Sequence, residues 1–129
     1  MLVIDANVAV AACARPNGFE YLGLELAGPP LLWSEARSTL HLNVSKGMID
    51  KERARRLHER LEAAPVSLIN PPELGREAWR VADEFGWGRT YDAEFVALAR
   101  MFDCRLVTLD TRLRRGTDRL GFVVTPAEL

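Results

Sequence analysis

The stretch over residues 93–102 constrains the fold of this 129-residue chain more than any other. It reads AEFVALARMF, and nearly every position except Glu94 and Arg100 is apolar. A surface helix carries its apolar residues along one stripe, so a helix that is apolar on most sides must be covered on most sides. We therefore expect a central, buried helix here, with Asp92 just inside its start and Thr90 as its N-cap.

Two short apolar runs elsewhere in the chain each end on an acid. Residues 106–109 follow the central helix and lead to Asp110, and residues 1–4 open the chain and lead to Asp5. Runs of this length and composition are typical of buried strands. Both acids are therefore expected at the carboxyl end of a strand.

Proline, glycine and the apolar spacing divide the rest of the chain into further elements. Helices are predicted at residues 6–14, 19–26, 35–47, 49–63 and 73–85, and further strands at 31–33, 66–69 and 122–125. Ser34 is the expected N-cap of the helix that Glu35 opens. The segment 111–119 is short, polar and basic, and is expected to be a loop.

Strands thus alternate with helices along the chain, which predicts an α/β fold, a three-layer α/β/α sandwich with a mostly parallel central sheet. With 48% hydrophobic residues the chain can bury one core, so a single domain over residues 1–129 is expected. In such sheets ligands bind beyond the carboxyl ends of the strands. Asp5 and Asp110 belong to that edge, and Glu35 and Asp92 open helices that point back to it. Four carboxylates are therefore predicted to face one crevice.

The composition favours no particular partner. A formal net charge of −1 gives no general attraction to nucleic acids or membranes, so any polyanion site must be a local patch. Cys13 and Cys104 lack metal-ligand spacing, and we interpret both as small core residues in a reducing compartment. The apolar N-terminal run lacks a basic leader and is too short to span a bilayer. A cytoplasmic protein with no membrane partner is expected.

A cluster of carboxylates has a definite chemistry. Like charges in a partly dry cleft raise the pKa of one another unless a cation neutralises them. Oxygen ligands without nearby Cys or His favour Mg²⁺ or Mn²⁺ over Zn²⁺, and such an ion activates water next to phosphate oxygens. Each acid alone also has a structural interpretation, because acids stabilise helix starts and cap turns. The conjunction of four favours a metal site for phosphodiester hydrolysis.

Four motifs, VIDANV, SEARSTL, TYDAEFVALA and LVTLDTRL, together resemble the PIN-domain nucleases, in particular the VapC-like toxins of type II toxin–antitoxin modules. They follow the family's order and span nearly the whole chain. The resemblance implies that the motif acids are catalytic and hold a divalent metal: Asp5, Glu35, Asp92 and Asp110. It places Asn7 and Thr108 behind them, where they orient ligands or a water. Some relatives carry a further acid where this chain reads TRLRR, which leaves the number of metal ions open.

The resemblance further implies an Mg²⁺-dependent endoribonuclease that cuts structured RNA such as tRNA or rRNA, acts as a homodimer and has a cognate antitoxin. The antitoxin's tail is expected in a groove between the early helices. Leu22, Leu26, Leu40 and Val44 are candidates for its walls, although the simpler interpretation of any one of them is a place in the core. RNA requires positive charge beside the acids. The candidates for this role are Arg37, Arg89, Arg112, Arg114 and Arg115.

Three alternatives remain open. A PIN-type nuclease of RNA processing differs from a toxin in its gene neighbourhood. A receiver-like phosphoacceptor module also collects acids at strand ends and binds Mg²⁺, but it needs a lysine near the site, and Lys46 and Lys51 belong to the middle helices. A degenerate domain that only binds a partner is disfavoured because all four motif acids are present.

Overall fold

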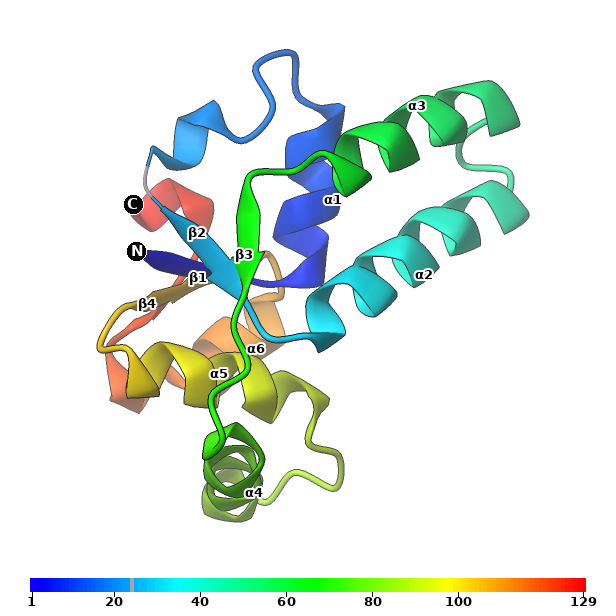
Figure 1. Cartoon of the computed structure of the whole chain (residues 1–129). Helices are drawn as coiled ribbons and strands as arrows, with labels where there is room; N and C mark the ends of the chain where they lie inside the picture. Colours follow the sequence, from blue (N-terminus) through cyan, green and yellow to red (C-terminus); the bar gives the residue numbers. More distant parts are fainter. Residues whose placement is uncertain (24) are drawn as a thin grey trace.

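The computed structural model describes residues 1–23 and 25–129 and contains one parallel sheet (Figure 1). Its strand order is β3-β2-β1-β4-β5, and every pairing is parallel. The strands are β1 (Leu2–Ile4), β2 (Leu26–Gly28), β3 (Val66–Leu68), β4 (Arg105–Val107) and β5 (Val123–Val124). The predicted parallel sheet is confirmed.

Helices cover both faces of this sheet (Figure 1). On one face α1 (Ala6–Ala14), α2 (Leu31–Ser45) and α3 (Lys51–Glu62) pack against one another, and on the other α4 (Leu74–Phe85) packs against α5 (Tyr91–Met101). Helix α6 (Thr111–Gly116) follows β4, and short 3-10 turns lie at Glu20–Leu22, Asp118–Leu120 and Pro126–Glu128. This is the predicted α/β/α sandwich. None of the described helices is long and apolar enough to cross a membrane.

Helix α5 is the central helix that the sequence predicts. Six of its eleven residues are at most 2% exposed, namely Ala93, Phe95, Val96, Ala97, Leu98 and Ala99. It contacts α4 on one side and both β1 and β4 on the other. Because α5 begins at Tyr91, Asp92 lies in its first turn, as predicted.

The region over residues 19–33 differs from the sequence prediction. The predicted helix 19–26 is replaced by the turn Glu20–Leu22 and the start of β2, and its Leu24 lies outside the described residues. The predicted strand 31–33 is instead the first turn of α2, so Ser34 and Glu35 lie inside that helix. The apolar run is explained by burial of this turn, since Leu32 is fully buried. The turn is tight, because a Cβ on Gly28 would lie 2.6 Å from a methyl of Leu32.

Two further boundaries move near the carboxyl edge. Strand β4 ends at Val107, so Leu109 lies beyond it and is 46% exposed. The segment 111–119, expected to be a loop, forms α6 and the turn that follows it. Asp110 caps α6, because its Oδ1 accepts the backbone N–H groups of Arg112 and Leu113 at 2.9 and 3.2 Å.

Several apolar residues for which the sequence allowed either a groove wall or a place in the core belong to the core. Leu22, Leu26 and Leu40 are each 4% exposed, which confirms their simpler interpretation. Cys13 is buried and Cys104 partly buried, and both are free thiols. Their packing agrees with the interpretation of both cysteines as small apolar residues.

Candidate active site

The carboxyl ends of β1 and β4 form the point at which the chain connections diverge. From β1 the chain crosses to β2, whereas from β4 it crosses to β5 on the other side of the sheet. The two strands are neighbours, with Ile4 opposite Val107. Ligands in parallel α/β sheets bind at such a switch point. Asp5 and Thr108 are the first residues beyond the two strands.

Asp5 is held at both of its carboxylate oxygens. Its Oδ1 accepts the backbone N–H of Val8 at 3.0 Å, which makes Asp5 the N-cap of α1. Its Oδ2 accepts the hydroxyl of Thr108, a fully buried residue. The Thr108 hydroxyl oxygen in turn accepts the backbone N–H of Asp110 at 3.0 Å. One threonine therefore links the two strand ends that carry acids.

The four motif acids line one cavity of about 260 Å³, together with Asn7. Asp5 follows β1, Glu35 lies in the second turn of α2, Asp92 in the first turn of α5, and Asp110 precedes α6. As the side chains are placed, no three His, Cys, Asp or Glu of the described residues are arranged closely enough to hold a metal ion. The acids thus surround a shared space.

Two hydroxyl residues of the cavity were not singled out from the sequence. Ser38 and Thr39 line it beside Glu35. They follow Glu35 by three and four residues, which is the spacing of neighbours on one helix face. This spacing is the signal in the sequence that locates them.

The other negative charges of the cavity affect the pKa of the Glu35 carboxyl group. Its pKa is raised to about 7, first by burial and then by the charges of Asp92, Asp5 and Glu94. A protonated Glu35 is therefore populated near neutral pH. Repulsion of this kind is relieved by a bound cation.

The pKa values of Asp5 and Asp92 are shifted in the same direction. Burial is the largest cause of the raised pKa of Asp5, opposed by the hydrogen bond from Thr108 and reinforced by Asp92 and Asp110. Asp92 is exposed as a residue, yet burial of its carboxyl raises its pKa, as does Asp110, while Arg112 acts against this. The acids thus interact with one another through space, as a functional cluster would.

Of the five arginines that the sequence suggests for RNA, the structure brings Arg89 and Arg112 beside the acids. Both line a second hollow of about 560 Å³ that adjoins the acid cavity. Arg115 is exposed on α6, where its Nε donates to the carbonyl of Thr111 at 3.4 Å.

The remaining two arginines have other partners. Arg114 donates to both carboxylate oxygens of Glu128, at 2.8 and 2.9 Å, and to Asp118 at 2.6 Å. Arg114 also lowers the pKa of Glu128 to about 2. The Nε of Arg37 donates to Nε2 of His58 at 3.1 Å in a hollow between α2 and α3. Arg37 follows Glu35 by two residues, which places it about 200° further round the helix.

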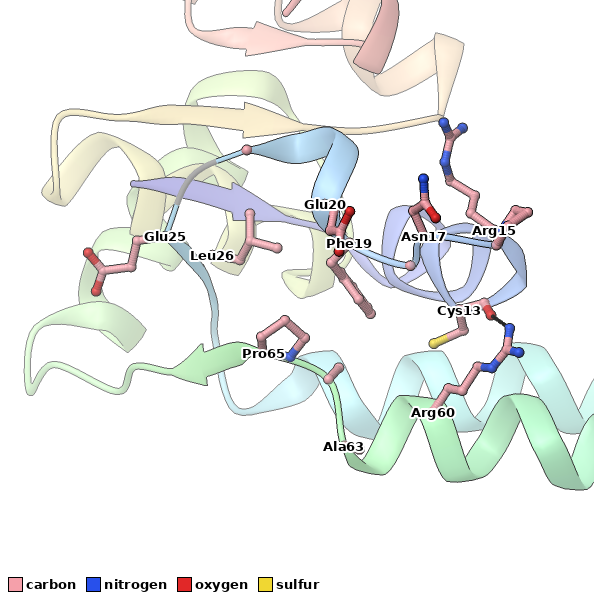
Figure 2. Close-up of a pocket in the computed structure, with 14 residues that line it drawn as sticks. Cys13, Arg15, Asn17, Phe19, Glu20, Glu25, Leu26, Arg60, Ala63 and Pro65 are labelled. Atoms are coloured by element: carbon pink, nitrogen blue, oxygen red, sulfur yellow. Dashed lines mark hydrogen bonds between the residues drawn. The ribbon is translucent and has the colours of Figure 1, made fainter.

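A larger hollow, of about 690 Å³, lies at the amino ends of strands β2 and β3, whereas the acid cavity lies at the carboxyl ends of β1 and β4 (Figure 2). Leu26, the first residue of β2, and Pro65, which precedes β3, line it together with Cys13. The carbonyl of Cys13 accepts a hydrogen bond from Arg60 Nη1 at 2.9 Å. Burial raises the pKa of the Cys13 thiol to about 11, so its reactive thiolate is disfavoured at neutral pH. Size therefore does not identify the active site, and the chemistry of the lining residues does.

The link through Thr108 gives a testable prediction. Thr108→Val keeps the shape of the side chain but leaves Oδ2 of the buried Asp5 without a donor and the Asp110 amide without an acceptor. We expect a loss of about 1–3 kcal/mol in the free energy of unfolding, measured in urea without metal. Thr111→Val, at an exposed position, is the control and should change little. In an Asp5→Ala background, Thr108→Val should lower the free energy of unfolding by less than it does in the wild type. An equal loss in both backgrounds would contradict the hydrogen bond between Thr108 and Asp5.

Comparison with known proteins identifies the class of protein that this fold and site define. The PIN domain family model matches residues 2–118, so the chain belongs to the PIN-domain family. Within it the chain is VapC-like, being 31% identical over 118 residues, or 88% of each chain, to VapC ribonuclease Mb0985 of Mycobacterium bovis. Ribonuclease VapC9 of Mycobacterium tuberculosis matches to the same extent.

Solved structures show the same architecture. PAE2754 from Pyrobaculum aerophilum superposes with a TM-score of 0.78 at 26% identity, covering 98% of this chain and 90% of that chain. FitAcB from Neisseria gonorrhoeae superposes with a TM-score of 0.61 at 21% identity, with both chains fully covered. At 21% identity, the similarity to FitAcB shows a shared fold only.

Proposed function

We propose that this protein is a divalent-metal-dependent endoribonuclease that hydrolyses phosphodiester bonds of structured RNA such as tRNA or rRNA. The observation that carries the proposal is the cavity at the switch point of the sheet, lined by four carboxylates. The relatives named as VapC ribonucleases support it. A receiver-like phosphoacceptor is disfavoured, because Lys46 and Lys51 lie at the far end of α2 and the start of α3.

The donor set fits a hard divalent cation. The cavity offers carboxylate, hydroxyl and amide oxygens, and none of its lining residues in the described chain is Cys or His. Such donors suit Mg²⁺, with Mn²⁺ as its substitute. When bound, the ion would supply a water of lowered pKa and a positive charge for phosphate oxygens. The residues that would hold it are Asp5, Glu35, Asp92 and Asp110.

The chain's own residues prepare this chemistry. The hydrogen bonds from Thr108 and the Val8 amide fix the orientation of Asp5 before any ligand binds. Glu35, with a pKa of about 7, is partly protonated near neutral pH, and a cation that binds its carboxylate displaces this proton, so ion binding and proton release are coupled. Arg89 and Arg112 line the hollow that adjoins the acids, where they would bind phosphates of the RNA.

The direct test uses purified protein and total RNA. We expect cleavage in Mg²⁺ or Mn²⁺, no cleavage in excess EDTA, and recovery when the metal is restored. An Asp92→Ala preparation made in parallel controls for contaminating ribonucleases and should be inactive. Cleavage that persists in EDTA, or an Asp92→Ala protein as active as the wild type, would overturn the proposal.

We also place the protein as the toxin of a type II pair, in agreement with its VapC-like sequence. An antitoxin tail has a groove available between α2 and α3, which project from the body of the domain (Figure 1). This groove, of about 390 Å³, is lined by Leu40, Val44 and Ala54, with Lys51 and Arg55 among its charged residues. We also propose that the protein forms a homodimer. An upstream reading frame encoding a DNA-binding head and an amphipathic tail would distinguish a toxin from an RNA-processing nuclease.

A further inference from the structure

The hollow beside the acid cavity carries aromatic side chains that hydrolysis itself does not require. Its volume, about 560 Å³, is within the range of about 300–1,000 Å³ typical of sites for small ligands. Glu35, Asp92 and Asp110 line both this hollow and the acid cavity, so the two spaces adjoin. Trp87 and Tyr91 line the hollow as well. Tyr91 is 53% exposed and immediately precedes Asp92.

Trp87 is held in place by a stack of side chains. Its ring lies on Phe85, with ring centroids 5.1 Å apart and planes 21° from parallel. The guanidinium carbon of Arg119 lies 4.5 Å from the Phe85 centroid. Arg119 is itself fixed by Glu84 at 3.2 Å, and Glu84 also accepts from Arg100 at 3.4 Å. The tryptophan is therefore positioned before any ligand arrives.

The backbone at Gly86 makes this stack possible. Gly86 ends α4 with φ +69°, a conformation that residues with a side chain rarely adopt. The chain turns back at this point, and the N–H of Trp87 donates to the carbonyl of Ala82 at 2.9 Å. The indole of Trp87 therefore lies against the ring of Phe85 and forms part of the wall of the hollow.

Two positive charges flank the aromatic wall. Arg89 and Arg112 line the hollow, and within residues 1–23 and 25–129 neither guanidinium makes a salt bridge or a hydrogen bond. Their charges are thus available to a ligand, in contrast to that of Arg114. Aromatic rings combined with free arginines form the usual site for single-stranded nucleic acid, where the rings stack on bases and the arginines bind phosphates.

We propose that this hollow binds one unpaired nucleobase of the RNA next to the cleaved phosphate, with the base stacked on Trp87. The inference rests on the proposed nuclease function and narrows its substrate to single strands, loops and bulges. A base inside a duplex is stacked on its neighbours and is not available to Trp87. Because every base has a π face, the site selects unpaired over paired RNA rather than one base over another.

The test measures RNA affinity without cleavage. A fluorescein-labelled single-stranded oligoribonucleotide of about 12 nucleotides, a length within the usual range of such sites, is titrated with protein in EDTA. Trp87→Ala should weaken binding about tenfold, because one stacked base contributes about 1–3 kcal/mol. Trp87→Phe keeps a ring and should retain most of the affinity. Trp79→Ala is the matched control, since Trp79 is 67% exposed on α4 and should leave binding unchanged.

A duplex of the same sequence completes the design. It should bind the wild type more weakly, and Trp87→Ala should not weaken it further. If Trp87→Ala proves unfolded by circular dichroism, Trp87→Leu, which keeps apolar bulk without a π face, must show the same loss for the single strand. Wild-type affinity in a folded Trp87→Ala or Trp87→Leu protein overturns the base site and leaves the nuclease proposal intact. A wild type that binds the single strand in the expected way but never cleaves RNA in Mg²⁺ overturns the nuclease proposal instead.

Discussion

Asp5→Asn should lower the rate of RNA cleavage at least about 100-fold while the protein remains folded, since even the residues behind metal ligands contribute about 10–100-fold. An asparagine at this position keeps an oxygen that can accept the Val8 amide and so preserves the cap of α1. It removes the negative charge, which is the property that a cation requires. The measurement is the initial rate on RNA in Mg²⁺, together with the thermal unfolding midpoint of both proteins.

A matched control exists at the start of α3. Asp50 is also an N-cap, its Oδ1 accepting the backbone N–H of Arg53 at 2.8 Å at the start of α3. Asp50→Asn makes the same chemical change at a cap that lies outside the acid cavity, so it should cleave RNA at the wild-type rate. If Asp5→Asn is as active as Asp50→Asn, the carboxylate of Asp5 has no part in the reaction.

The location of the acids could be predicted because parallel strands bring their carboxyl ends to one edge. The two runs that end on Asp5 and Asp110 are apolar enough to be identified as buried strands without knowledge of their partners. Pairing of β1 with β4, seen in the register of Ile4 with Val107, then places Asp5 level with Thr108. Elements whose apolar pattern is unambiguous, such as α5, were located within a residue or two.

Other features depend on contacts that a local pattern does not contain. Strand β2 is only Leu-Ala-Gly, and it is buried because β1 and β3 flank it. The stronger apolar run after it belongs to the start of α2, where Leu32 packs into the core, and this misled the strand prediction. Arg114 donates a hydrogen bond to Glu128, which lies fourteen residues further along the chain. The stack of Arg119 on Phe85 likewise joins distant segments.

Without divalent metal, Glu35→Gln should stabilise the protein at about pH 8 and change its stability little at about pH 5. The pKa of Glu35 is raised from 4.5 to about 7, so the folded state binds more protons than the unfolded state between these values. Stability therefore falls as pH rises through this interval, and the penalty is complete above about pH 7. After a discount for solvent at this half-buried group, the expected gain is about 1–2 kcal/mol.

The measurement is urea unfolding of both proteins in EDTA at several pH values, repeated in Mg²⁺. Glutamine cannot ionise, so the difference between the two proteins reports the charge of Glu35, including its repulsion with Asp5 and Asp92. Glu59→Gln makes the same substitution at an exposed residue of α3, which pairs with Arg55 at 2.6 Å outside the acid cavity, and is the control. Mg²⁺ should stabilise the wild type more than Glu35→Gln, because a bound cation removes the repulsion that the variant lacks. A variant that is instead less stable at about pH 8 without metal would mean that the Glu35 charge favours α2 through the helix dipole.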